Sequence, residues 1–235
     1  MAPGIIGPGT TAYTAAHNQI RAHARAYRAY QADFAATQGG KVGITLNVNW
    51  CEPRDPSDQA DITASDTCMN FNLGWYAHAI FVDGKYPEVS FVLIPRLPII
   101  CLRLFQNNNQ VMRLKIDDKS EAQGFEESRL PHFSDEDSAM ILGSSDFLGI
   151  NFYTANYAYP ETSDLAEVSW SADMDVGSYQ DETWYAAGSS WLKVTPWGIR
   201  QALNWASAQY GQPDIYVTEN GYSDKLGNID DLQRL

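Results

Sequence analysis

The stretch that decides the fold is Ile215-Tyr216-Val217-Thr218-Glu219-Asn220-Gly221, close to the C-terminal end of the chain. β-Branched and aromatic residues give way to a single carboxylate and an Asn-Gly pair. This pattern is typical of a short buried strand that delivers Glu219 to its C-terminal end. In parallel α/β folds that end carries the chemistry. An ordinary strand followed by an Asn-Gly turn has the same letters, so the heptad alone leaves both interpretations open.

Upstream, strand-like and helix-like patterns alternate along the chain. Alternating apolar residues predict strands over 41–49 and 147–153. Apolar residues at helical spacing predict helices over 14–36 and 64–78, and a further helix is predicted over 197–210, just after Pro196. The buried face of the first helix should hold His17, Ile20, Ala24, Tyr27 and Phe34. Strands that alternate with helices favour a parallel α/β sheet, and the βα repeat suits a (β/α)8 barrel.

Composition limits the classes of function. The chain has 235 residues, 44% of them hydrophobic and 19% charged, which describes a folded protein of a single domain over 1–235. Its formal net charge of -13 opposes binding to nucleic acid or to an anionic membrane, because both would repel it. A small uncharged substrate is compatible with this balance.

The cysteines and histidines show no metal-binding pattern. Cys51, Cys68 and Cys101 are too few and too scattered to predict a disulfide framework or a zinc site. His17 and His23 fall on a helical pattern, where packing or a satisfied hydrogen bond is favoured over catalysis. No metal ion and no other cofactor is expected.

Six stretches of the sequence together resemble the family 1 glycoside hydrolases, the retaining β-glucosidase family, whose nucleophile lies in a Thr-Glu-Asn-Gly run. They occur in the family's order and cover most of the chain. They are Ala2-Pro3-Gly4 with His17-Asn18 and Ala22-His23-Ala24, Gly43–Asn47 with Trp50 and Glu52-Pro53, Gly84–Pro87, Asp146–Thr154, Thr195–Ile199 and the heptad itself.

The resemblance implies roles for particular residues. Glu219 is expected to be the catalytic nucleophile, and the Asn-x-Tyr of the sixth strand, Asn151 and Tyr153, should place the phenol against it. Asn151 is also a candidate substrate-binding residue. Because aromatic faces stack on pyranose rings, Trp191 is the candidate for a wall of the sugar cleft. Glu52 imitates an Asn-Glu-Pro motif, but Cys precedes it, so a structural role is expected.

The resemblance also implies a partial barrel, covering about strands five to seven. The family's general acid lies in an Asn-Glu-Pro run on strand four, which has no match here. We therefore expect the full-length parent to be a retaining β-glycosidase, most simply a β-glucosidase acting on small β-glycosides, and this piece alone to be inactive. A non-catalytic sugar-binding or interaction relative on the same scaffold is the alternative. The intact Glu219 and Tyr153 favour the enzyme.

One segment departs from the family pattern. Residues 90–110 are rich in apolar residues but are interrupted by prolines and arginines, so they suit neither a membrane span nor a central strand. Excising 89–110 would restore the family's usual connection into the helix 112–122, and a retained intron is the hypothesis. The N-terminus has no signal-peptide pattern and no Asn-x-Ser/Thr site occurs, which leans towards a cytoplasmic location.

Overall fold

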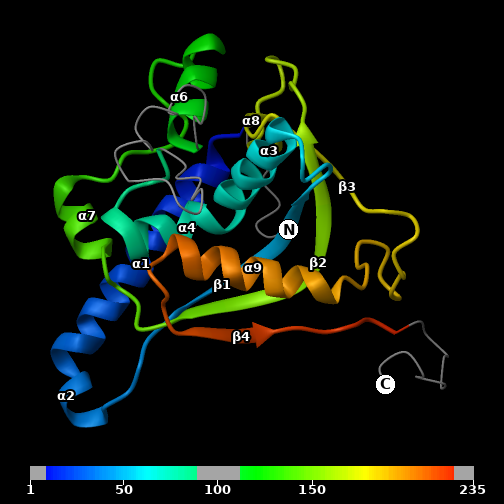
Figure 1. The fold of residues 1–235 in the computed structure, drawn as a ribbon. Coiled ribbons are helices and arrows are strands. Elements are labelled where there is room, and N and C mark those ends of the chain that lie inside the picture. The colour runs from blue at the N-terminus through cyan, green and yellow to red at the C-terminus, as the bar shows by residue number, and fades with distance from the viewer. Residues whose placement is uncertain (1–8, 89–111, 225–235) are drawn as a thin grey trace, which may run out of the picture.

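A computed structural model of the chain describes residues 9–88 and 112–224. Its centre is a sheet in which β1 (Ile44–Pro53) and β4 (Ile215–Glu219) run parallel to β2 (Leu148–Pro160), one on each side of it (Figure 1). The short strand β3 (Val176–Tyr179) pairs antiparallel with the C-terminal part of β2. The three parallel strands confirm the predicted α/β architecture and are consistent with part of a barrel.

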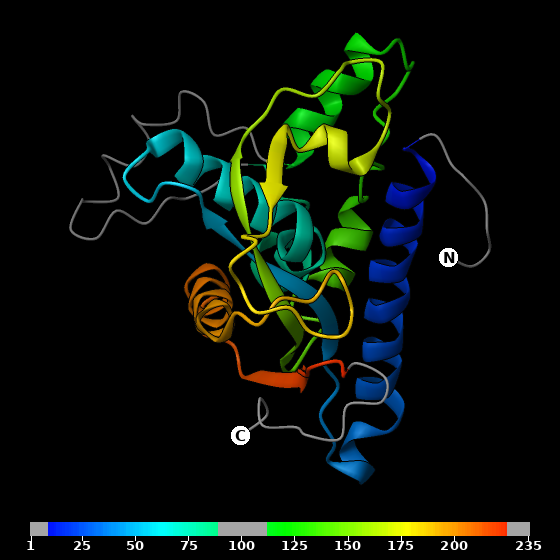
Figure 2. The same cartoon turned by 90° about the vertical axis from the view of Figure 1, so that its right-hand side faces the viewer.

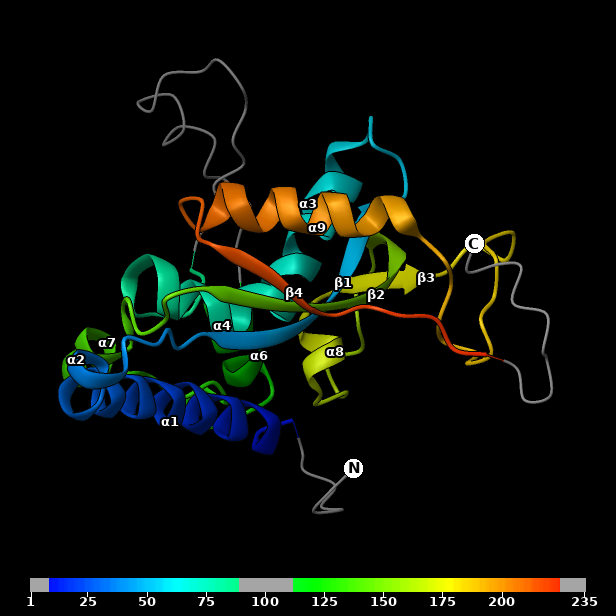
Figure 3. The ribbon, with the colours of Figure 1, turned by 90° about the horizontal axis from the view of Figure 1, so that it is seen from below.

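Helices connect the strands and cover the sheet. Figures 2 and 3 show α9 on one side of the strands and α1 on the other. The π-helical turn η1 interrupts the predicted second helix, and a second π-helical turn, η2, follows directly after its predicted end. The helical elements are α1 (Thr11–Asp33), α2 (Ala35–Gln38), α3 (Gln59–Met69), η1 (Asn70–Gly74), α4 (Trp75–His78), η2 (Ala79–Asp83), α6 (Met112–Ala122), α7 (Asp135–Ile141), α8 (Trp170–Asp173) and α9 (Pro196–Gln209).

The sheet has two chemically different faces. On its helix face, Leu46 and Val48 of β1 and Ile150 and Phe152 of β2 pack in one core with α3 and α9. Residues of alternate register point the other way, because successive side chains of a strand alternate between faces. We call this second side the polar face. It carries Thr45 and Asn47 of β1 and Gly149, Asn151 and Tyr153 of β2.

The first helix follows its predicted pattern except at its end. His17, Ile20, Ala24 and Tyr27 are buried, as the spacing predicts. Ile20 and Ala24 pack in a second core with α4, α6 and α7. Phe34 is half exposed, because α1 ends at Asp33 and the chain bends before α2. His17 and His23 both have hydrogen-bond partners, Tyr86 and the Ser144 carbonyl, which confirms the structural interpretation of these rings.

The prediction that Ile215–Glu219 is a buried strand is wrong for the residues described. Tyr216 is 50% exposed and Val217 is 46% exposed. Among the described residues, β4 pairs with β2 along one edge and with no strand along the other. The Lys41–Asp214 ion pair and the Phe147 ring, which contacts Tyr216, lie near the start of β4. The apolar pattern of β4 therefore predicts a buried strand, whereas the described part of the chain leaves Tyr216 and Val217 about half exposed.

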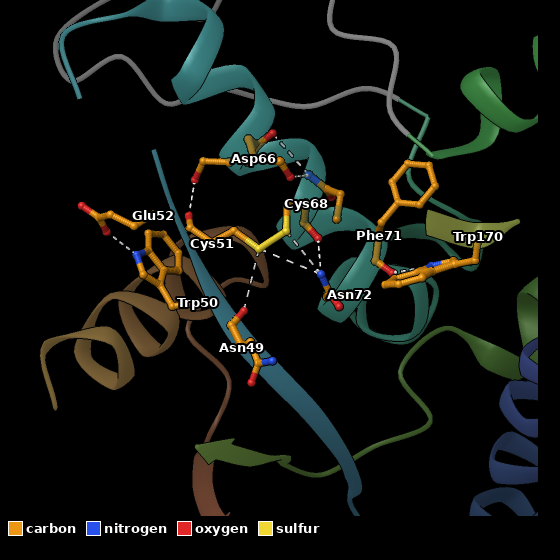
Figure 4. The surroundings of a disulfide bond; sticks show 11 residues. Asn49, Trp50, Cys51, Glu52, Asp66, Cys68, Phe71, Asn72 and Trp170 are labelled. Carbon is orange, nitrogen blue, oxygen red and sulfur yellow. Dashed lines mark hydrogen bonds between the residues drawn. A yellow bond between two sulfur atoms is a disulfide. The ribbon is translucent and has the colours of Figure 1, made fainter. Parts of the chain in front are cut away.

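The two described cysteines form a disulfide, which the sequence analysis did not predict. Cys51 near the end of β1 is bonded to Cys68 of α3, with their Cα atoms 6.2 Å apart (Figure 4). The Asn72 amide nitrogen lies 3.5 Å from Cys68 Sγ and 4.0 Å from Cys51 Sγ. The bond ties the carboxyl end of β1 to the helix layer. Because disulfides are rare in reducing compartments, it weighs against the expected cytoplasmic location.

The candidate insertion at 90–110 lies outside the described residues. The residues on either side of the undescribed segment nevertheless meet, because the Arg113 backbone N–H donates to the Pro87 carbonyl at 3.0 Å. The helix predicted over 112–122 begins there as α6. Within the described part of the chain, no helix is long and apolar enough to cross a membrane.

Candidate active site

A carboxylate and a phenol meet at the C-terminal ends of two neighbouring strands. Tyr153 Oη donates a hydrogen bond of 2.8 Å to Glu219 Oε2. The register of β2 and β4 aligns Asn151 with Glu219, and Tyr153 follows two residues later on the same polar face. The hydrogen bond to Glu219 raises the pKa of the Tyr153 phenol above its usual range. The phenol therefore stays protonated, and able to donate, through neutral pH and beyond it.

Asn151 lies beneath this pair and links three strands. Its side-chain nitrogen donates to Asn47 Oδ1 of β1 at 2.9 Å, and its oxygen accepts a hydrogen bond of 2.7 Å from Thr218 Oγ1 of β4. Only 9% of the residue is exposed. An amide with one donor and one acceptor position used in this way retains one N–H and one lone pair. Its main role is to join the three strands, and any contact with a sugar would use the remaining N–H or lone pair.

Trp191 lies next to the phenol. Its ring meets the Tyr153 ring edge-on with the centroids 5.8 Å apart, and 54% of its surface is exposed. The loop that carries it is held to β2 by Gln180, whose amide donates to both the Trp191 carbonyl and Thr154 Oγ1. An exposed indole fixed beside the carboxylate can offer a face to a sugar ring.

A pocket opens between the ends of β2 and β4 and the start of α9. Its volume is about 590 Å³, within the usual range for small-molecule sites. Polar and aromatic side chains at its mouth include Tyr153, Asn220 and Tyr222. The full lining is Phe152, Tyr153, Leu192, Val194, Thr195, Pro196, Ile199, Asn220, Gly221 and Tyr222.

Glu52 lies away from this site. The Trp50 indole N–H donates to its carboxylate, and the strand register aligns Glu52 with Tyr157. Tyr157 is six residues beyond Asn151 on β2 (157 − 151), which at the rise of a strand is about 20 Å. Glu52 therefore does not sit at the separation of about 5–5.5 Å that two carboxyl groups of a retaining glycosidase require. The structural role expected for it agrees with this geometry.

Three polar residues of the site were not predicted. Asn47 and Thr218 bracket Asn151, and Asn220 donates through its amide to the Phe152 carbonyl at 2.8 Å. The signal for Asn47 was present, because it occupies the same polar-face register of its predicted strand as Asn151 does in the next. Simple alternation also places Thr218 on the polar face, but a threonine within a β-branched run gave no signal of its own.

The comparisons with known proteins agree with one another. The model of glycosyl hydrolase family 1 matches residues 1–235. The chain is 41% identical to lactase/phlorizin hydrolase of Homo sapiens over 95% of its length and 10% of that protein. It is 36% identical to cytosolic beta-glucosidase of Cavia porcellus, over 100% of the chain and 45% of that protein. A beta-glucosidase structure from Humicola insolens, in complex with glucose, superimposes with a TM-score of 0.72 at 34% identity, covering 99% of this chain and 42% of that one.

Parallel strands with crossover helices, together with the beta-glucosidase structure on which the chain superimposes, indicate part of a (β/α)8 barrel. The chain belongs to glycosyl hydrolase family 1. It spans less than half the length of each of these relatives.

Proposed function

We propose that the protein carrying these residues is a β-glycosidase, with β-glucosidase activity, that works by the retaining double-displacement mechanism with Glu219 as its nucleophile. The observation that carries the proposal is the 2.8 Å hydrogen bond from Tyr153 Oη to Glu219 Oε2 at the carboxyl ends of adjacent parallel strands. Family membership supports the reaction class, and the names of the relatives support the β-glycoside substrate.

The chemistry follows from the two oxygens of the carboxylate. Tyr153 holds Oε2, so Oε1 would attack the anomeric carbon while the bond to the leaving oxygen breaks and a general acid protonates that oxygen. The product is a glycosyl ester on Glu219. Water, deprotonated by the same group acting as a base, then hydrolyses the ester and returns both groups to their starting states. Forming the ester removes the negative charge from the Glu219 carboxylate. The Tyr153 phenol remains protonated throughout, so its O–H can keep donating to the oxygen where negative charge remains.

Asn151 and Trp191 would act on the sugar. Asn151 has one N–H left to donate to a sugar hydroxyl, and Trp191 offers an exposed indole beside the reacting carboxylate. We also propose that β1, β2 and β4 are strands five to seven of the barrel. The general acid would then come from outside the matched residues, and residues 1–235 alone would lack half of the catalytic pair.

The direct test is replacement of Glu219 in a full-length enzyme that contains residues 1–235. Glu219→Gln keeps the shape and removes the nucleophile, so turnover of a nitrophenyl β-glucoside should fall below detection while the circular dichroism and melting temperature stay unchanged. Glu52→Gln is the matched control, because that carboxylate lies about 20 Å along the sheet and should leave turnover within about twofold. Retained turnover in Glu219→Gln would contradict the proposal. Loss of turnover in Glu52→Gln alone would move the assignment to that residue.

A further inference from the structure

The pairing of β2 with β4 is interrupted next to Glu219. Ile150 is aligned with Val217, but the next residue, Asn151, is aligned with Glu219. Thr218 is therefore an extra residue on β4, with no aligned partner on β2. Such a β-bulge bends one strand and re-aims the side chain that follows it.

The bulge determines which face of the sheet carries the carboxylate. Aligned residues of parallel neighbours point to the same face, and a shift of one residue reverses every side chain that follows. With uninterrupted pairing, Glu219 would be aligned with Phe152, whose ring is buried on the helix face against α9. With Thr218 as an extra residue, Glu219 is aligned with Asn151 and points to the polar face. It can reach Tyr153 only there.

The Thr218 side chain is held in a site built for it. Its hydroxyl donates to Asn151 Oδ1 at 2.7 Å, and Asn151 is in turn fixed by Asn47. Its methyl group lies over Gly149, where a Cβ atom would come within 3.1 Å of Thr218 Cγ2 and within 2.5 Å of Thr45 Oγ1. The absence of a side chain at Gly149 therefore leaves room for the threonine. The hydroxyl then donates to Asn151, the residue that the bulge leaves aligned with Glu219.

The residue after Glu219 closes the bulge from the other side. The Asn220 amide donates to the Phe152 carbonyl at 2.8 Å, which ties the strand end back to β2 one residue beyond Asn151. Glu219 thus lies between two side-chain anchors, Thr218 and Asn220, each bonded to β2.

We propose that Thr218 is a positioning residue, which stabilises the bulge through Asn151 and so turns the Glu219 carboxylate towards Tyr153. This inference rests on the proposed function, because positioning has a kinetic consequence only if Glu219 is the nucleophile. Loss of the Thr218 hydroxyl should loosen the bulge and let Glu219 populate orientations away from the phenol.

The test compares Thr218→Val, which keeps the shape, with Thr218→Ser, which keeps the hydroxyl, in the full-length enzyme. Tyr216→Phe removes a different hydroxyl from the same strand and serves as the control. We expect Thr218→Val to lower the rate of covalent labelling by a 2-deoxy-2-fluoro glucoside by about tenfold, through the loss of one partly buried hydrogen bond. Thr218→Ser should recover most of that rate, and Tyr216→Phe should match the wild type.

A double-mutant cycle separates positioning from general stability. If Thr218 acts by holding Glu219 against the phenol, then removing the phenol with Tyr153→Phe should cost little further rate once Thr218→Val is present. Two independent effects would multiply. Thr218→Ala, which removes the hydroxyl without adding a branched side chain, should show the same coupling, and it keeps the test open if Thr218→Val does not fold.

The outcomes distinguish the two proposals. If the wild-type label falls on a residue other than Glu219, the proposed function is wrong and the positioning role falls with it. If Glu219 is labelled but Thr218→Val reacts at the wild-type rate, or its effect multiplies with that of Tyr153→Phe, the positioning role alone is overturned.

Discussion

Replacing Tyr153 by Phe removes one oxygen atom from the site and should slow formation of the glycosyl-enzyme. The oxygen donates to Glu219 Oε2 at 2.8 Å, and the ring itself is held by its edge-on contact with Trp191, which Phe preserves. The change is therefore confined to one hydrogen bond between a neutral donor and a carboxylate. Such bonds are among the stronger ones in proteins because one partner is charged.

The size of the effect depends on how open the site is. A hydrogen bond to a charged group corresponds to about 10- to 100-fold in rate. Both groups are open to solvent in the described residues, which favours the lower part of this range, and closure of the site by further residues would move the effect upward. We therefore expect a decrease of about 10- to 100-fold in the glycosylation step.

Pre-steady-state kinetics with a dinitrophenyl β-glucoside measures this step separately from hydrolysis of the ester. Melting temperature controls for folding, and Trp191→Phe tests whether the ring contact alone changes the rate. An unchanged burst rate would show that the phenol does not act on the nucleophile.

Three further predictions concern the chain as a whole. Residues 1–235 expressed alone should neither melt cooperatively nor hydrolyse a nitrophenyl β-glucoside, because β1 and β4 each have an unpaired edge among the described residues and the proposed general acid lies outside the matched residues; a monodisperse, active product would refute this. Deletion of 89–110 from the full-length enzyme should preserve the melting temperature and turnover, because the flanking backbone is already hydrogen-bonded; a loss of folding would show that the segment belongs to the structure. Tryptic peptides 42–54 and 55–85 of the enzyme isolated without reductant should be joined by the disulfide; their separate recovery would contradict the Cys51–Cys68 pairing.

The sheet could be predicted because its strands have clear boundaries. Alternating residues identified β1 and β2, and the run before Asn220 identified β4 over the same residues that the structure assigns to it. The short strand β3 was missed, since four residues that include Gly177 give little signal. The predicted second helix was broken by the π-helical turn η1, which its apolar spacing did not reveal, and it continues past its predicted end into η2.

The orientation of Glu219 is the part of the site that sequence periodicity would get wrong. Ile215, Val217 and Glu219 are separated by two residues each, so simple alternation places all three on the helix face. The pairing of Glu219 with Tyr153 came from family resemblance, and the bulge at Thr218 supplies its physical cause. A bulge depends on side-chain hydrogen bonds between strands that are about 67 residues apart in the chain. No local pattern encodes it.

The disulfide was missed for a similar reason. Cys51 and Cys68 are 17 residues apart, and nothing in that spacing distinguishes a bonded pair from two separate thiols. They meet because α3 packs back across the end of β1, which is a property of the folded βα unit.

The measurement that tests the central claim most directly is the site of covalent labelling. A full-length enzyme containing residues 1–235 is treated with a 2-deoxy-2-fluoro β-glucoside, digested and sequenced by mass spectrometry. The retaining mechanism predicts one fluoroglucosyl group per chain, on Glu219, and no label in Glu219→Gln. A label on any other residue, or turnover that continues with no ester on Glu219, would contradict the assignment of the nucleophile.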